Sequence, residues 1–267
     1  MKKGFTLIEI LAALATMAIL LVAFTRFFGG TLRASSTLQV RNELLSEATI
    51  AQGLIASRVK EAWFVWPKGA SLELTRSGWT TQNPFDGGQT WTVGKRFLAM
   101  ILPPLKDDVP CSLDRDGCFR FFAYYPLPRS YYVAHASVVE TLEPDPANDA
   151  RTWVLMEYRA VYRKSGQARC PVRNEQPDPN NLSYRGRKGR FLLDYLQPPT
   201  DPWDTRFNYP GLFLHSADAT AVTVNLRLAR AAAQRVYRVP DHEAPFSLTV
   251  RPKNVGVPVS DESPYCQ

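Results

Sequence analysis

Residues 1–26 of the chain read MKKGFTLIEILAALATMAILLVAFTR. Two lysines and a glycine precede an apolar stretch in which Glu9 is the only charged side chain before Arg26. Residues 5–25 are about long enough to span a bilayer as a helix, and the two lysines would hold that end in the cytoplasm. Because no small-residue cleavage site follows the stretch, we expect the helix to be retained as a membrane anchor.

Residues 3–9, KGFTLIE, closely resemble the processing motif of type IV prepilins and pseudopilins. These are the subunits of type IV pili, type II secretion pseudopili and DNA-uptake pili. The resemblance implies that a prepilin peptidase cuts between Gly4 and Phe5 and methylates the new Phe5 amine. It also implies that Glu9 pairs with the N-terminal ammonium of a neighbouring subunit.

The carboxylate of Glu9 needs an explanation because it lies within the apolar stretch. Placing an ionised carboxylate in a membrane helix costs about 2.5–3.5 kcal/mol, so it calls for a partner or a function. The alternative is that Glu9 lies near the membrane interface, where it favours the positive end of the helix dipole and reaches water.

The composition agrees with an exported, anchored protein. Of 267 residues, 45% are hydrophobic and 21% are charged, which is enough for one folded ectodomain. The formal net charge is +7. Loss of residues 1–4 would remove two lysines and leave 30 basic against 25 acidic side chains, a mild excess of +5.

One long helix is expected from about Phe5 to Trp66, followed by a β-rich region. Beyond Arg26 apolar residues recur every three or four positions, which indicates an amphipathic helix: Leu44, Ala48, Ala51, Ile55, Val59, Ala62 and Trp66. Pro67 would end it, and a break or hinge is expected at Gly29-Gly30. The predicted organisation is a removed leader at 1–4, a transmembrane or filament-core helix at 5–31, an amphipathic continuation at 32–66 and an ectodomain at 67–267.

After Pro67 the pattern changes to alternation, with many aromatic and β-branched residues, which predicts strands. The stretches with this pattern are 71–76, 89–93, 97–102, 119–125, 131–139, 153–162, 191–196, 221–228 and 246–250. In 221–228 the polar residues at alternate positions, Asn225 and Arg227 among them, predict a strand with one face in water. The predicted fold class is α+β: a long N-terminal helix packed on an antiparallel, β-rich ectodomain of pilin-like type.

Four cysteines, Cys111, Cys118, Cys170 and Cys266, all lie on the expected outer side of the membrane, where disulfides persist. Three complete pairings are open. Cys111 with Cys118 is favoured because the residues between them are rich in turn formers. Cys170 would then pair with Cys266. This disulfide would close a long loop and, by reducing the entropy of the unfolded chain, stabilise the fold by about 4–5 kcal/mol.

Enzyme motifs such as G-x-S-x-G, H-E-x-x-H, the P-loop and G-x-G-x-x-G are missing. The histidines stand singly, so we expect no zinc site, and His135 is expected to be half-buried in a sheet. Asp114 and Asp116 supply too few carboxylates for calcium. We therefore expect neither a cofactor nor a catalytic site; a membrane-anchored enzyme is the least favoured alternative.

Residues 184–190, YRGRKGR, are the one segment with a binding pattern. Arg185, Arg187, Lys188 and Arg190 alternate with glycines that let the backbone approach a ligand, which suits a polyanion such as DNA. The simpler interpretation is a solvated basic loop.

The length of the ectodomain and its C-terminal strands resemble the larger minor pilins of the PilW/PulJ type. The resemblance implies a structural subunit of a type IV or DNA-uptake pilus that helps initiate assembly or cap the tip; the alternative is a minor pseudopilin of type II secretion. It implies as partners other pilins, the prepilin peptidase, the assembly machinery and membrane lipid. The location would be the bacterial inner membrane, with the ectodomain in the periplasm, and then the pilus surface.

Overall fold

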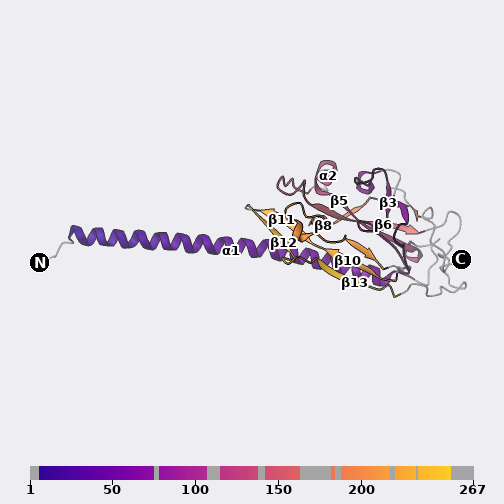
Figure 1. Cartoon of the computed structure of the whole chain (residues 1–267), viewed down its shortest axis with the longest axis horizontal. Coiled ribbons are helices and arrows are strands. Elements are labelled where there is room, and N and C mark those ends of the chain that lie inside the picture. The colour runs from indigo at the N-terminus through magenta and orange to yellow at the C-terminus, as the bar shows by residue number, and fades with distance from the viewer. Residues whose placement is uncertain are drawn as a thin grey trace. The chain divides into compact units, whose positions relative to one another are not determined.

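A computed structural model describes residues 6–74, 78–106, 115–137, 142–162, 182–183, 188–216, 220–232 and 234–253. Its first element is helix α1, Leu7–Glu61, which is continuous over 55 residues (Figure 1). The predicted break at Gly29-Gly30 is wrong, because both glycines lie inside the helix. The chain divides into two compact units, Met1–Glu43 and Leu44–Gln267, so the final turns of α1 belong to the β-rich unit.

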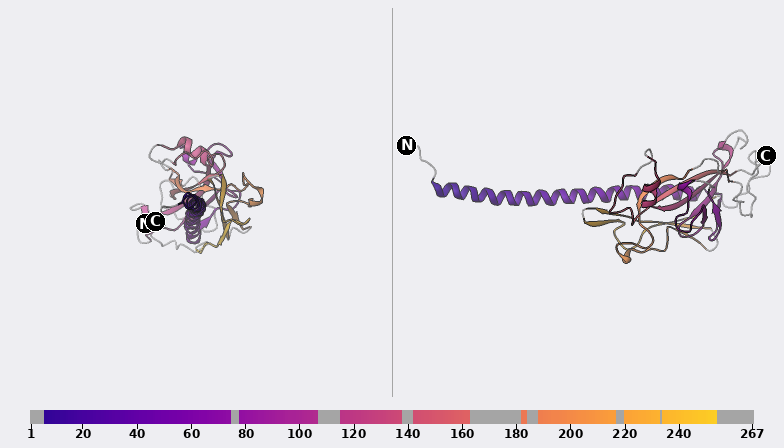
Figure 2. Two further views of the ribbon diagram at one scale, coloured as in Figure 1. Left: turned by 90° about the vertical axis from the view of Figure 1, so that its left-hand side faces the viewer. Right: turned by 90° about the horizontal axis from the view of Figure 1, so that it is seen from above.

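The final turns of α1 bury the apolar stripe that the sequence predicts. Leu44, Ala48, Ala51, Ile55 and Val59 are each at most 2% exposed. These turns run alongside β-strands (Figures 1 and 2). Burying one Leu, Ile or Val side chain stabilises by about 1.5–3 kcal/mol, so the stripe attaches the helix firmly to its own domain.

The helix ends at Glu61, five residues before the predicted end. Ala62 and Trp66 are fully buried as predicted, but the backbone around them is extended and pairs with a strand. The amide of Trp63 donates to the carbonyl of Ile101 at 2.8 Å, and that of Trp66 donates to Ala99 at 3.1 Å. The aromatic and β-branched run 63–66 favours a strand over another helical turn.

The main sheet contains eight strands of the described chain, in the order β1-β4-β5-β6-β8-β11-β12, with β7 paired to β6. Every pair is antiparallel. The strands are β1 Phe64–Val65, β4 Leu98–Leu102, β5 Phe119–Pro128, β6 Trp153–Tyr162, β7 Leu182–Ser183, β8 Arg190–Leu196, β11 Leu228–Ala232 and β12 Arg235–Val239. The α+β class is therefore confirmed.

Two smaller sheets complete the described β-structure. One has the order β13-β10-β9 and the other pairs β2 with β3. Their strands are β2 Ser71–Glu73, β3 Thr90–Thr92, β9 Phe213–His215, β10 Val222–Leu226 and β13 Phe246–Val250. Short 3₁₀ turns lie at η1 Trp79–Thr81, η2 Arg115–Gly117 and η4 Thr205–Phe207.

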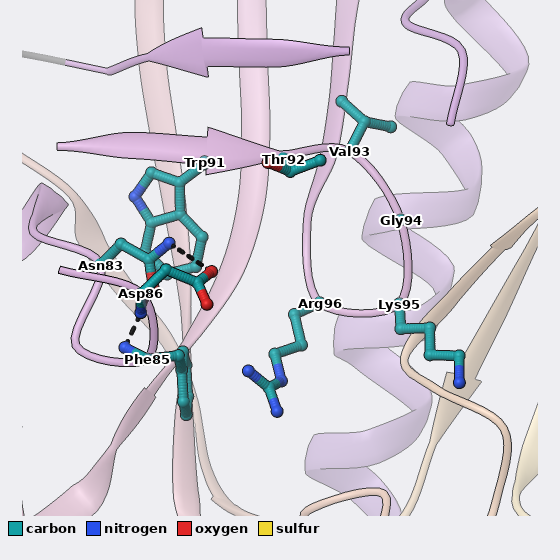
Figure 3. A pocket seen from close by; sticks show the side chains of 9 residues that line it. All are labelled: Asn83, Phe85, Asp86, Trp91, Thr92, Val93, Gly94, Lys95 and Arg96. Carbon is teal, nitrogen blue, oxygen red and sulfur yellow. Dashed lines mark hydrogen bonds between the residues drawn. The ribbon is translucent and has the colours of Figure 1, made fainter. Parts of the chain in front are cut away.

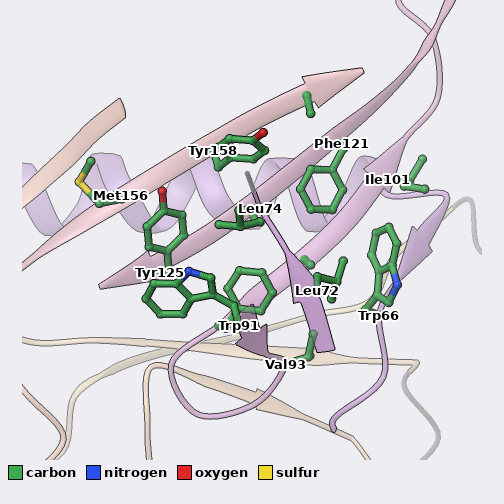
Figure 4. Packing of buried hydrophobic residues seen from close by; sticks show 14 of the residues in the cluster. Trp66, Leu72, Leu74, Trp91, Val93, Ile101, Phe121, Tyr125, Met156 and Tyr158 are labelled. Atoms are coloured by element: carbon green, nitrogen blue, oxygen red, sulfur yellow. The ribbon is translucent and has the colours of Figure 1, made fainter. Parts of the chain in front are cut away.

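The central strands β4, β5 and β6 of the main sheet are buried on both faces over most of their length. On one face a core cluster joins β4, β5 and β6 to β2 and β3, and includes Trp66, Trp91, Phe121 and Tyr158 (Figure 4). The other face receives α1, because the guanidinium of Arg58 lies 5.0 Å from the ring centre of Phe122. Large aromatic residues thus fix the position of the strands on which the candidate sites depend.

The predicted strand 131–139 is wrong: its first part lies in helix α2, Arg129–His135. Pro128 stands at the N-cap and ends β5, and the amide of Ala136 closes the helix by donating to the carbonyl of Tyr132 at 2.9 Å. Only Arg129 and Tyr132 of α2 are buried. The spacing of these two residues, three apart, is helical. The sequence predicts a strand instead because Tyr131, Tyr132 and Val133 are aromatic or β-branched residues, which favour strands.

The predicted strand 221–228 divides at Arg227 into β10 and β11, which belong to different sheets. Its polar face is not in water, since Asn225 is 2% exposed and Arg227 is 0% exposed. The Asn225 amide donates to the carbonyl of Gly211 at 2.8 Å, and its oxygen accepts from Ser247 at 2.7 Å. Burial of Asn225 is tolerated because it finds these partners. Arg227 donates to the carbonyl of His242, but its Nε and Nη1 have no hydrogen-bond partner among the described residues.

Candidate functional site

Helix α1 begins with a capping box formed by Thr6 and Glu9. The amide and the hydroxyl of Thr6 donate to Oε2 of Glu9 at 2.8 and 3.0 Å, and the amide of Glu9 donates to the Thr6 hydroxyl at 3.4 Å. This reciprocal arrangement satisfies the amide of Thr6, which precedes the helix, while the amide of Glu9 also donates to the carbonyl of Thr6 at 3.1 Å. The resemblance implies a role for Glu9 in assembly; its second role, in capping, was not predicted, although the spacing T-x-x-E indicates it.

One oxygen of the Glu9 carboxylate stays open. Oε1 accepts no hydrogen bond from any residue in the described ranges, whereas Oε2 accepts two from Thr6. A carboxylate with a fixed orientation and one open oxygen can receive a cation from outside the chain. Local capping and pairing with a neighbour are therefore compatible.

The following turns of α1 expose a long apolar surface. The helix contains an 18-residue window with a mean hydropathy of 2.6, none of it buried, which makes it long and apolar enough to cross a membrane. Its large exposed apolar residues are Leu7, Ile8, Ile10, Leu11, Leu14, Met17, Ile19, Leu20, Leu21, Val22, Phe24, Phe27 and Phe28. The hydroxyls of Thr16, Thr25 and Thr31 donate to carbonyls one turn back, at 2.9–3.1 Å. Polar groups satisfied in this way are compatible with lipid.

The processing residues Gly4 and Phe5 lie outside the described residues, as do Cys111, Cys170 and Cys266. Cys118 is buried and disulfide-bonded. Its partner is therefore one of the other three cysteines, and the pairing of Cys111 with Cys118 stays a prediction.

The basic segment is described from Lys188 onward, and Arg185 and Arg187 lie outside the described residues. Lys188 and Arg190 are exposed on either side of Gly189. A side chain at Gly189 would collide with neighbours, because its Cβ would lie 2.3 Å from Oη of Tyr125 and 3.0 Å from the carbonyl oxygen of Thr80. The glycine thus allows a close approach, but to the protein itself and not to a ligand.

A hollow of about 300 Å³ lies between two loops of the β-rich unit (Figure 3). Asn83 shapes one loop: its amide donates to Asp86 at 3.1 Å and its oxygen accepts from the amide of Phe85 at 3.1 Å. On the other loop the guanidinium of Arg96 lies 4.4 Å from the ring centre of Phe85. Asp86 and Arg96 form no ion pair with each other (Figure 3), so the hollow presents both charges to solvent.

A buried ionic network around Arg129 was missed by the sequence analysis. Its guanidinium is 2% exposed and pairs with Asp149 and Asp194, with 2.9 Å between Nε and Asp194 Oδ1. Burial raises the pKa of Asp194, an effect that the hydrogen bonds and charge of Arg129 partly offset. The three residues are far apart in sequence, so no local pattern could reveal the network. We assign it the role of holding α2 to β8, since buried pairs specify geometry more than they stabilise.

The predicted environment of His135 is wrong. The residue is exposed and ends α2, with Nδ1 2.8 Å from the carbonyl oxygen of Tyr131. Asp116 forms an ion pair of 3.3 Å with Lys106, while Asp114 lies outside the described residues. Within those residues, no three His, Cys, Asp or Glu side chains come together as metal ligands.

Comparisons with models of protein families, with curated proteins and with solved structures found no match. Function must therefore be argued from the chemistry of these surfaces.

Proposed function

We propose that the chain is a minor pilin or pseudopilin: a structural, non-enzymatic subunit that leaves the bacterial inner membrane to join a helical filament. The observation that supports this is the first half of α1, where a long exposed apolar surface begins with an oriented carboxylate. Such a surface is stable in lipid or against other helices, because water disfavours exposed apolar area. A subunit that moves from membrane to filament exchanges one apolar environment for the other.

In the proposed cycle the N-terminus is cytoplasmic and the β-rich unit periplasmic until extraction. The prepilin peptidase cuts before Phe5, and the methylated ammonium of one subunit then meets the open Oε1 of Glu9 in the next. Thr6 supports this pairing because it fixes Oε2 at 2.8 Å and so orients the carboxylate. The same features suit a type II secretion pseudopilin, from which the neighbouring genes would distinguish a pilus subunit.

Two substitutions separate the charge of Glu9 from its capping role. Glu9→Gln keeps the capping box, because glutamine accepts the same hydrogen bonds, but it removes the charge. Thr6→Ala removes the box and keeps the charge. If charge pairing drives assembly, Glu9→Gln abolishes incorporation, since an unpaired buried ammonium costs about 3–5 kcal/mol, while Thr6→Ala reduces it only modestly.

The measurement is the amount of subunit in sheared filaments relative to membranes, in the native host. Glu9→Val serves as a further variant, which should insert into the membrane at least as well as the natural protein. Wild-type incorporation of Glu9→Gln would refute the pairing. Intact-mass measurement tests processing separately: the mature protein should begin at N-methylated Phe5, and retention of Met1 would exclude the family.

A further inference from the structure

Aromatic rings from three elements meet at one surface of the β-rich unit. Phe191 of β8 lies 5.7 Å from Tyr132 of α2, which lies 5.2 Å from Trp79 of η1, and Trp79 stacks on His135 at 6.0 Å between ring centres. Tyr131 adds a ring 4.2 Å from His135. We call Trp79, Tyr131, His135 and Phe191 the aromatic surface, since Tyr132 is buried beneath them.

The aromatic surface is accessible and rigid. Phe191 is 40% exposed and His135 is exposed, whereas Trp79 and Tyr131 are half-buried and pack against the core cluster. The hydroxyl of Tyr131 also donates to Oε1 of Gln82 at 2.7 Å. Rings held in this way lose little further freedom when a ligand stacks on them.

Two free cations border these rings. The amide of Gly189 donates to the hydroxyl of Thr80 at 3.0 Å, which holds Lys188 and Arg190 beside η1 and directly before Phe191. Both side chains are exposed, and neither forms an ion pair with any residue in the described ranges. Their charges are therefore available to an anion from outside.

The hollow of Figure 3 is tied to η1, because the indole N–H of Trp91 in its lining donates to the carbonyl of Thr81 at 2.8 Å. Gln82, the partner of Tyr131, directly precedes Asn83 of the hollow, where Lys95 and Arg96 are exposed and Arg96 stacks on Phe85. Asp86 is the one carboxylate among the lining residues, and one of its oxygens accepts from Asn83. Two cations and one carboxylate thus line the hollow, so positive charge predominates there as well.

We propose that the aromatic surface, with Lys188 and Arg190, binds single-stranded nucleic acid. Bases stack on exposed rings while cations contact the phosphates, a combination that tolerates any sequence. A duplex conceals the faces of its bases, so it can use only the cations. An acidic polysaccharide offers charge without flat aromatic bases and is the competing ligand. The inference does not rest on filament assembly, because binding is a property of the isolated protein.

The experiment measures fluorescence anisotropy of labelled oligo-dT of about 20 nucleotides, longer than the site of one typical module. Full-length protein in zwitterionic nanodiscs is titrated against oligo-dT, an abasic strand of equal length, the matching duplex and polygalacturonate. We expect oligo-dT to bind at least tenfold more tightly than the other three. Log affinity should fall with log salt with a slope of about −1.4 if two phosphates are neutralised.

Variants assign the binding to its residues. Trp79→Ala and His135→Ala should each weaken oligo-dT binding about fivefold to hundredfold; His135 is exposed, so that variant remains informative if Trp79→Ala fails to fold. The double change Lys188→Ser with Arg190→Ser should remove most of the salt slope. Its control is Arg235→Ser with Arg251→Ser, two exposed cations near β12 and β13. Equal binding of the abasic strand or polygalacturonate, no binding at low salt, or unchanged affinity of His135→Ala would overturn the proposal.

Discussion

In the first half of α1 the isoleucine, leucine and phenylalanine side chains are exposed, whereas in the second half a stripe of the same residue types is buried. Ile19 is 69% exposed and Ile55 is 0% exposed, although both occupy regular helix. The second half obtains its apolar surroundings from its own β-rich unit. The first half has no such cover among the described residues, and it is long and apolar enough to cross a membrane.

Helical backbone geometry alone therefore does not determine whether a helix packs against its own domain. Both halves satisfy their backbone hydrogen bonds internally. They differ in the width of the apolar face: nearly the whole circumference in one half, and one stripe in the other. A helix that is apolar all round needs an apolar solvent, while an amphipathic helix needs one partner surface.

We expect the greatest difference in the free energy of unfolding between Ile55→Ala and Ile19→Ala. Ile55→Ala should lower the free energy of unfolding of the β-rich unit by about 2–5 kcal/mol, because it leaves a cavity in a fully packed site. Ile19→Ala removes the same atoms from an exposed position and should change that free energy of unfolding by less than about 0.5 kcal/mol. Urea unfolding in mild detergent, followed by tryptophan fluorescence, measures both. Equal losses would show that the two halves share one folding unit.

Lowering the pH should reduce the stability of the folded protein by a smaller amount, because the ring nitrogens of His215, at the end of β9, are buried. Burial, and secondarily the charge of Lys68, lowers the pKa of His215 to about 4, below its usual value of 6.5. The folded protein therefore binds the proton less readily than the unfolded chain, and stability present above pH 6.5 is lost as the pH falls toward 4. We expect a loss of about 1–3 kcal/mol over that range.

The control for the pH prediction is His215→Leu, which should flatten the stability profile between pH 6.5 and 4. Denaturation of the same detergent-solubilised protein at several pH values provides the measurement. Because the group lies in the β-rich unit, the helical content of the first half of α1 should stay constant. A profile that keeps its slope in the leucine variant would assign the effect to another group.

We expect the smallest loss of stability when a glutamine of α1 is replaced, and it should differ between Gln52 and Gln39. The amide of Gln52 donates to the carbonyls of Val224 and Phe246 at 3.2 and 3.0 Å, joining the helix to β10 and β13. The amide of Gln39 donates only to Glu43, one turn away, at 3.0 Å on an exposed surface. Gln52→Ala should cost about 1–2 kcal/mol, and Gln39→Ala close to nothing. Thermal unfolding of both variants measures these losses of stability. A larger loss for Gln39→Ala than for Gln52→Ala would contradict the role of Gln52 in joining the helix to β10 and β13.

Much of the fold could be predicted because its patterns are local. The buried stripe from Leu44 to Val59 is a helical period, and strands β6 and β13 have the predicted bounds, since alternation and β-branched residues mark them. Errors arose where two patterns overlapped. Ala62 and Trp66 continue the helical spacing although they flank a strand. Residues 131–133 are aromatic or β-branched, which favours a strand, although they lie in a helix.

Some candidate sites consist of residues close together in the sequence, and others of residues from distant segments. The Thr6–Glu9 box and the apolar surface involve neighbours in sequence. The apolar surface was predicted from residues 5–25, whereas the box was not, although its T-x-x-E spacing indicates it. Arg129 with Asp149 and Asp194, and the rings of Trp79, His135 and Phe191, come from distant segments. Only strand pairing and helix packing bring such residues together.

Residues 5–66 were enough to predict that α1 starts with an apolar stretch long enough to cross a membrane and continues with one apolar stripe, because helix length, period and hydrophobicity are properties of contiguous residues. Tertiary structure alone decided which polar residues are buried and which aromatic rings share a surface. Asn225 and Arg227 have the spacing of a wet strand face, yet both are buried. Gly211 and Ser247 supply the partners of Asn225, whereas Arg227 donates from Nη2 to the carbonyl of His242, stacks on Phe207 and leaves Nε and Nη1 without a partner among the described residues. Burial of a polar group depends on partners from elsewhere in the chain, and those partners are known only once the fold is.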